Sequence, residues 1–151
     1  MRLIEIKDAF KIDYGAPCPI LLADDHHLRL FFYGGPDNND RIEVRFISSP
    51  FFSFSPPNDE ALNGHPYYEL GLVSCGFFEL LDSDLLNKIK SYGRFHPYYN
   101  PSAYDDSHHY IITFKEQLFE CIAGKYEVII HRNKTYDAAA SILNDMFNNK
   151  T

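Results

Sequence analysis

The stretch that decides the fold runs from position 109 to position 131 and reads His-Tyr-Ile-Ile-Thr-Phe (109–114), Leu-Phe-Glu-Cys-Ile-Ala (118–123) and Tyr-Glu-Val-Ile-Ile-His (126–131). β-branched and aromatic residues dominate all three runs, and such residues favour a pleated, half-buried surface. Short polar turns separate the runs, and the second turn begins with Gly124, as a type II′ turn prefers. The stretch therefore predicts a three-stranded antiparallel meander.

Within the middle run, side chains alternate between two faces. Phe119 and Cys121 share one face, which we interpret as core, so Cys121 is not expected to act as a nucleophile. Glu120 shares the other face with apolar neighbours. It is expected to be either solvated or paired, with Arg132 or Lys115 as the partner.

Working upstream, two further β-prone runs (28–33 and 42–46) flank a loop of Gly, Pro, Asn and Asp at 34–40. The second run alternates strictly between apolar and charged residues, which predicts an antiparallel hairpin with one solvated face. Residues 48–65 are rich in Ser, Pro, Asn and Phe, and we interpret them as a long surface loop or an edge excursion of the sheet.

Two helices are predicted. Ser83 is a suitable N-cap for a helix of about nine residues that stops at Gly93. Thr135 is expected to cap a C-terminal helix whose apolar stripe includes Leu143 and Phe147, and we expect both side chains to be buried against the sheet.

Parallel β-α-β connections would need a helix between most strands, and the sequence has too few. The prediction is therefore an α+β fold over residues 1–151 as a single domain. It is a twisted, mostly antiparallel sheet of about six or seven strands, with a short central helix and a C-terminal helix packed on one face.

Composition narrows the class of protein. Apolar residues make up 45% of the chain and charged residues 23%, which is ordinary globular usage. No apolar run reaches the ~18 residues of a membrane span, and the charged N-terminus does not resemble an export signal. Three widely spaced cysteines without a CxxC motif favour reduced thiols. We therefore expect a cytoplasmic protein without membrane association.

The acidic charge is concentrated in one segment. Acidic residues outnumber basic ones 21 to 14, which argues against a nucleic-acid partner. Residues 46–87 contain six acidic residues and no Lys or Arg, so this segment carries −6 of the net −7.

Aromatic residues lie among these acidic residues, as at an interface with an aromatic centre and a charged rim. The sequence thus favours a non-enzymatic protein that docks or neutralises a basic protein partner, a toxin-immunity protein being the concrete form. The oligomeric state stays open. The expected binding residues are Phe52, Phe54, Asp59, Glu60, Tyr67, Tyr68 and Glu69.

The alternative is a small hydrolase or a metal-assisted enzyme. The tetrapeptide His-Pro-Tyr-Tyr occurs twice, at 65–68 and 96–99, and presents each histidine at a rigid corner. The candidate site residues of this alternative are His65, His96, His109 and Glu120. No motif with metal-ligand, phosphate-loop or nucleophile-elbow spacing is present, so no catalytic residue, metal or cofactor is predicted.

Residues 64–123 resemble a family of small, uncharacterised bacterial cytoplasmic proteins. The resemblance rests on Gly64-His65-Pro66, on His96-Pro97, and on the run 109–114 followed by 119–123. It implies a bacterial, cytoplasmic, single-domain protein and carries no activity.

Overall fold

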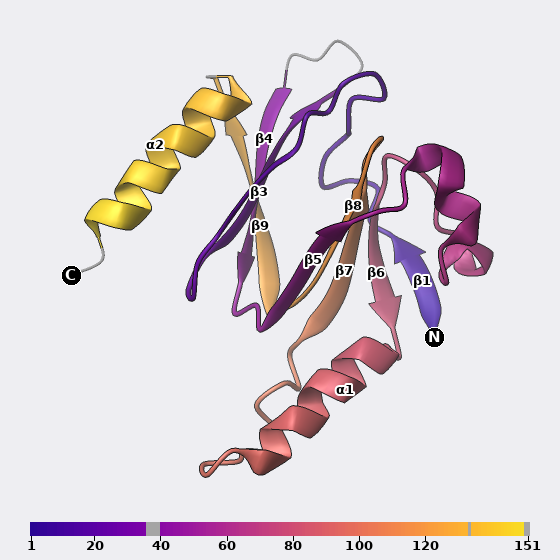
Figure 1. Cartoon of the computed structure of the whole chain (residues 1–151), viewed down its shortest axis with the longest axis vertical. Coiled ribbons are helices and arrows are strands. Elements are labelled where there is room, and N and C mark those ends of the chain that lie inside the picture. Colours follow the sequence, from indigo (N-terminus) through magenta and orange to yellow (C-terminus); the bar gives the residue numbers. More distant parts are fainter. Residues whose placement is uncertain (36–39, 133, 150–151) are drawn as a thin grey trace.

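The computed structural model describes residues 1–35, 40–132 and 134–149. Two antiparallel sheets pack face to face (Figure 1), one with the strand order β1-β6-β7-β8-β5 and the other with the order β2-β3-β4-β9. The strands of the five-stranded sheet are β1 (Arg2–Glu5), β5 (Phe51–Ser55), β6 (Phe77–Leu81), β7 (His108–Thr113) and β8 (Leu118–Ala123). Those of the four-stranded sheet are β2 (Ile20–Ala23), β3 (Leu28–Gly34), β4 (Asp40–Ile47) and β9 (Lys125–His131).

The α+β class is confirmed, but the strands form two sheets rather than one, and there are more of them than expected in the described residues. The β3–β4 hairpin forms as predicted, with Leu30 opposite Val44. Residues 36–39 of its expected loop lie outside the described residues. The proline-rich excursion contributes β5, an edge strand that pairs with β8.

The predicted meander is wrong in its third strand. β7 and β8 pair as expected, but β9 pairs with β4 in the other sheet, with Val128 opposite Val44. Gly124 is not a hairpin turn. Its N–H donates to the carbonyl of Ile47 at 2.8 Å, which directs the chain toward the second sheet.

Alternation along the strands builds the interior between the sheets. Phe119 and Cys121 of β8 face this interior as predicted and are fully buried, and Phe46 of β4 lies against Phe119. Phe10, from the segment after β1, contacts the rings of Phe32 and Phe77 and so bridges the two sheets.

The outer face of the five-stranded sheet is also covered. The 3₁₀ helices η1 (Asp59–Gly64) and η2 (Tyr68–Leu70) lie over it, and Leu62 and Leu72 pack on Phe78 and Ile111. Both faces of β7 are therefore covered, and every residue from His109 to Thr113 is buried instead of alternating between buried and exposed. We call residues 59–73 the acidic layer.

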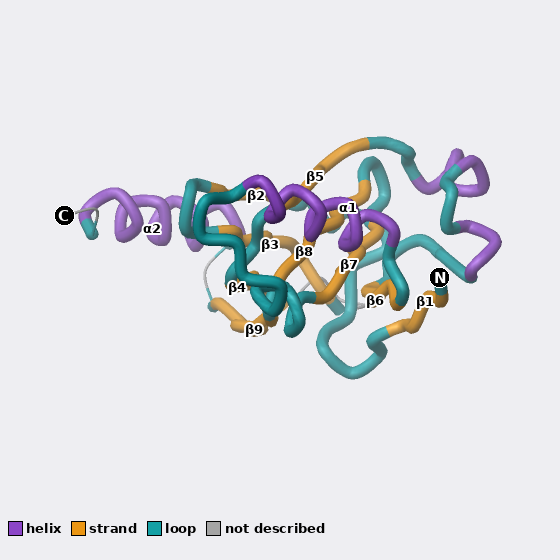
Figure 2. The backbone as a smooth tube through the Cα atoms, turned by 90° about the horizontal axis from the view of Figure 1, so that it is seen from below, coloured by secondary structure: helices purple, strands orange, loops and turns teal. Residues whose placement is uncertain are grey.

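Helix α2 (Thr135–Asn148) packs on the outer face of the four-stranded sheet through small side chains. Ala138 and Ala139 lie against Phe31, and Met146 is buried. The expectation for Leu143 and Phe147 is wrong, because they are 50% and 77% exposed. The alanines allow the closest approach, so they turn the larger side chains away from the sheet, and the far end of α2 projects beyond the strands (Figure 2).

Helix α1 (Asp84–Tyr92) forms as predicted at one end of the sheets. The Ser83 side chain accepts a hydrogen bond from the N–H of Leu86 at 3.0 Å, and the helix is followed at Gly93 by a third 3₁₀ helix, η3 (Gly93–Phe95). In the described part of the chain, no helix has the length and apolar character needed to cross a membrane.

Candidate functional site

The acidic layer brings part of the predicted binding set together. Asp59, Glu60 and Tyr68 line one shallow hollow of about 400 Å³, next to the exposed Val73. Glu69 is exposed beside Tyr68 on the same layer. The Asn58 side chain caps η1 by accepting from the N–H of Ala61, which fixes the backbone at Asp59 and Glu60.

The other acidic residues of the segment 46–87 lie elsewhere. Glu79 on β6 pairs with His108. Asp82 lies in the turn after β6, and Asp84 is in the first turn of α1. The charge that forms one segment in the sequence is therefore divided between two places in the fold.

The predicted aromatic residues divide in the same way. Tyr68 is 43% exposed on the acidic layer, whereas Tyr67 is partly buried with its ring edge-on to His109. Phe54 packs into the interior between the sheets. Phe52 is exposed on β5 and lines a different hollow, together with Asp25.

Beneath the acidic layer lies a buried polar cluster. His109 is fully buried, and its Nε2 lies 2.8 Å from Oε2 of Glu120 while its Nδ1 lies 2.6 Å from Oγ of Ser83. The Ser53 hydroxyl donates to Oε1 of Glu120 at 3.4 Å. These contacts link β5, β7 and β8 to the start of α1.

This cluster satisfies its own polar groups. Burial alone would raise the pKa of Glu120, but the hydrogen bond from His109 and the neighbouring imidazoles hold it below its ordinary value. The Oγ of Ser83 bonds His109 and also caps α1. Glu120 is therefore paired and not solvated. Its partner is His109, not Lys115 or Arg132 as expected from the sequence.

The two His-Pro-Tyr-Tyr segments fold alike. In each, the histidine ends a 3₁₀ helix, and its Nδ1 accepts from the backbone N–H two residues later, at 3.1 Å for His65 and 3.0 Å for His96. His65 lies near Glu120 and His109, and burial lowers its pKa. His96 lies on an exposed turn after α1. Of the four residues expected for the enzyme alternative, His65, His109 and Glu120 lie together, and His96 lies elsewhere.

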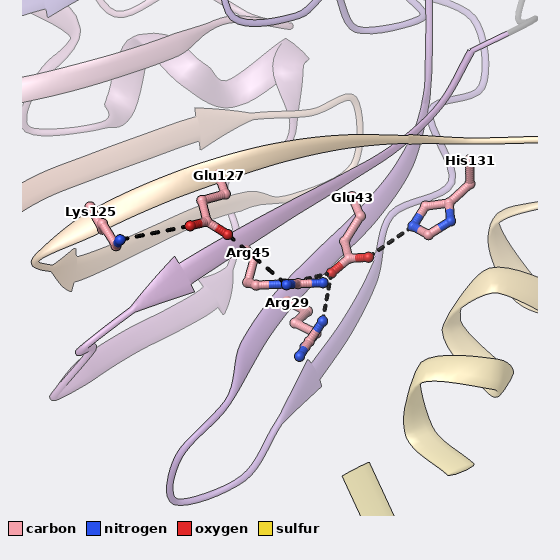
Figure 3. Close-up of polar contacts among 6 residues, drawn as sticks. All are labelled: Arg29, Glu43, Arg45, Lys125, Glu127 and His131. Atoms are coloured by element: carbon pink, nitrogen blue, oxygen red, sulfur yellow. Dashed lines mark hydrogen bonds and ion pairs between the residues drawn. The ribbon is translucent and has the colours of Figure 1, made fainter. Parts of the chain in front are cut away.

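A second buried carboxylate was missed from the sequence. Glu43 on β4 is fully buried, and it bonds Arg29 Nη1 at 2.9 Å, Arg45 Nε at 3.3 Å and His131 Nε2 at 2.8 Å (Figure 3). Burial would raise the pKa of Glu43, but the hydrogen bonds from His131 and Arg29 and the charge of Arg45 hold it low. These contacts join β3, β4 and β9. The alternating run 42–46 suggested a solvated charge, because sequence alternation does not reveal that the arginines cover this face.

Among the described residues, no three His, Cys, Asp or Glu side chains are arranged to hold a metal ion. Comparisons with protein-family models, curated proteins and solved structures find no match to this chain.

Proposed function

We propose that this protein is a non-enzymatic binding protein whose acidic layer docks a basic protein partner. One observation carries the proposal. Asp59, Glu60 and Tyr68 share one hollow in a segment whose sequence contains no cation, with Glu69 and Val73 exposed beside them. An aromatic side chain with carboxylates around it suits a cationic surface that carries an apolar contact.

The anchoring of the layer supports this role. Leu62 and Leu72 are buried against the five-stranded sheet, and Tyr67 packs on His109. A surface held in place before binding loses little conformational entropy when a partner docks, so more of the contact energy remains as affinity.

Lys115 contacts the acidic layer through its backbone and not through its charge. The carbonyl of Lys115 accepts from the N–H of Asp59 at 2.8 Å, but its ammonium group lies 3.5 Å from the carbonyl of Gly15. The carboxylates of the layer are thus available to steer a cationic partner during encounter.

The hydrolase alternative receives less support from the same cluster. The imidazole of His109 is fully buried, and the only hydroxyl that bonds it, among the described residues, is the buried cap of α1. A nucleophile and its base need access to substrate, and this pair is closed to solvent. The cluster is better explained as the support on which the acidic layer rests.

A toxin-immunity protein is the concrete form of the proposal. Such a protein must capture a folded, cationic enzyme quickly and hold it, which calls for charge steering in the association rate and apolar contacts in the dissociation rate. The natural partner to try is the product of the gene adjacent to this one.

The test measures association and dissociation rates with that gene product at about 50 and about 500 mM salt, because the screening length of exposed charges falls from about 14 Å to about 4 Å over this range. The test variant combines Asp59→Asn, Glu60→Gln and Glu69→Gln. The control variant combines Asp8→Asn, Asp137→Asn and Asp145→Asn, exposed positions outside the layer. Both variants change the net charge from −7 to −4.

We expect the test variant alone to lose about tenfold in association rate and most of its salt dependence. Tyr68→Ala should instead speed dissociation about tenfold or more, as for a central contact residue. Equal slowing by both triple variants would assign the effect to net charge and overturn the docking surface. If no binding is detected at both salt concentrations, this gene product is not the partner.

A further inference from the structure

A second charged region lies at the other end of the fold. Residues 85–104 contain three cations, Lys88, Lys90 and Arg94, and no acidic residue. They form most of α1 and the turns that follow it. In Figure 1, α1 lies below the strands, away from the 3₁₀ helices of the acidic layer.

These residues enclose a hollow of about 290 Å³ with an unusual lining. It contains two cations, side-chain amides and hydroxyls, and no carboxylate; the nearby Asp105 and Asp106 do not line it. The lining residues are Asn87, Lys90, Ser91, Arg94, Tyr99, Asn100, Pro101 and Tyr104.

Neither cation in the lining is paired within the described chain. Lys90 is half-buried and Arg94 exposed, and the ion pairs of the described residues include neither. Lys90 lies in the last turn of α1, where the helix dipole favours a cation. That position accounts for Lys90 but not for Arg94, which lies beyond the helix in η3.

The wall opposite the helix is a series of hydrogen-bonded turns. The N–H of Ala103 donates to the carbonyl of Asn100 at 3.1 Å, and the N–H and Oγ of Ser102 both donate to Oδ1 of Asn100. This fixes the Asn100 amide and leaves its N–H₂ group as a donor. A Cβ atom at Gly93 would lie 3.7 Å from the ring of Tyr104 and 3.8 Å from that of Tyr99, so both rings pack close to the end of α1.

We propose that this hollow binds the phosphate group of a small-molecule ligand. A phosphate group at neutral pH carries close to two negative charges and several acceptor oxygens arranged as a tetrahedron. Two cations match that charge, and the Asn100 amide and the tyrosine hydroxyls add donors from other directions. A planar carboxylate would be satisfied by Arg94 alone, in the two-point geometry that guanidinium groups favour. This inference concerns a different face from the acidic layer and does not depend on it.

The test follows backbone amide shifts by NMR while inorganic phosphate, 5′-AMP or succinate is added to the full chain. We expect phosphate and 5′-AMP to shift the amides of residues 85–104, and succinate, which has similar charge, to bind about tenfold more weakly. Lys90→Gln and Arg94→Gln should each weaken phosphate binding about tenfold, the effect of losing one charge-assisted contact.

Lys88→Gln is the matched control, because Lys88 is exposed on the same helix and does not line the hollow. It should change the dissociation constant by less than about twofold. If Lys88→Gln weakens binding as much as Arg94→Gln, the effect is diffuse charge and the site is wrong. Equal affinity for succinate would overturn the phosphate assignment. No shift at about 10 mM phosphate, ten times the Kd of a millimolar site, would overturn the pocket itself.

Discussion

The two His-Pro-Tyr-Tyr corners have the same sequence and the same local structure, yet they occupy opposite environments. In both, the histidine N–H closes a 3₁₀ turn at 2.9 Å, and the N–H of the second tyrosine donates to the histidine carbonyl, at 3.0 Å in one corner and 3.1 Å in the other. Tyr67 of the first corner packs on His109, whereas Tyr98 of the second is 88% exposed. The tetrapeptide therefore determines the turn, and the surrounding sheet determines whether the turn is anchored.

Each corner presents aromatic side chains at the surface of the molecule. The first corner holds the acidic layer against the five-stranded sheet and presents Tyr68 to solvent. The second leaves Tyr98 and the neighbouring Phe95, 90% exposed, without cover from the described chain. Both corners are preformed, because proline and the histidine bond restrict the backbone in each.

The largest effect should come from removing the support of the first corner. His109→Leu removes the partner that Ser83 and Glu120 share, leaving Ser83 only its bond from the N–H of Leu86 and Glu120 only the weak bond from Ser53. A buried polar group whose hydrogen bonds are not satisfied costs about 1–3 kcal/mol. With two groups affected, we expect a loss of about 3 kcal/mol or more in the free energy of unfolding, measured by urea denaturation. The control His108→Leu changes a partly exposed pair with Glu79 and should cost less than about 1 kcal/mol. Equal losses would show that the buried cluster contributes no more to stability than the partly exposed pair of His108 and Glu79.

The next effect tests the two corners directly. Tyr67→Ala removes a partly buried ring that packs on His109 and on the apolar residues around Leu62 and Leu72, and we expect it to cost about 2 kcal/mol. Tyr98→Ala removes an exposed ring and should change stability by no more than about 0.5 kcal/mol. The same denaturation experiment measures both. A large loss in Tyr98→Ala would mean that the second corner is packed in solution and that the contrast is wrong.

These corners also show what the sequence could predict. Proline fixes the conformation of its predecessor, so both corners were expected from His-Pro alone, as was the nine-residue helix that starts after Ser83. Such features depend on neighbours in the chain. The exposed fraction of Tyr67 or Tyr98 depends on segments far away in sequence, so no local pattern distinguishes them.

The same limit explains the errors in the sheets and the site. Alternation in β9 shows which residues share a face but not which strand lies alongside, and the bond from Gly124 to Ile47 could not be foreseen. Glu120 was recognised as an acid in an apolar row, but its partner His109 comes from a neighbouring strand. The apolar stripe of α2 was visible, whereas the choice of the alanine face over Leu143 depends on how closely the helix approaches the sheet.

The pH dependence of stability should also distinguish the two corners. Burial lowers the pKa of His65 below the ordinary 6.5, so the unfolded chain takes up the proton first as the pH falls. The contribution of His65 is therefore complete above about pH 6.5 and is lost as the pH falls through its folded pKa; protonation also costs Nδ1 its bond from the N–H of Tyr67. We expect unfolding free energies between about pH 6.5 and 4.5 to decline with acidification in the natural protein and less steeply in His65→Gln.

The matched control is His96→Gln, which changes the same residue type in the exposed corner and should keep the slope of the natural protein. Below about pH 4.5 a second loss begins, because the pKa of Glu120 is also lowered and its stabilising charge disappears there. Glu120→Gln should reduce that second loss. If His96→Gln flattens the upper range as much as His65→Gln does, the two histidines share one environment and the comparison of the corners is wrong.

The smallest effect on stability should come from the proline that the two corners have in common. Pro66 and Pro97 are both exposed and both follow a histidine in an extended conformation, so each proline acts mainly by restricting the unfolded chain. Pro66→Ala and Pro97→Ala should therefore each lower stability by about 0.4–1 kcal/mol, and by equal amounts within error. The measurement is a pair of urea denaturation curves with the double variant as an additivity check, since the corners share no contact. A markedly larger loss in Pro66→Ala would show that the anchored corner needs the proline to keep Tyr67 on the sheet. In that case, tertiary packing would influence the turn itself as well as its exposure.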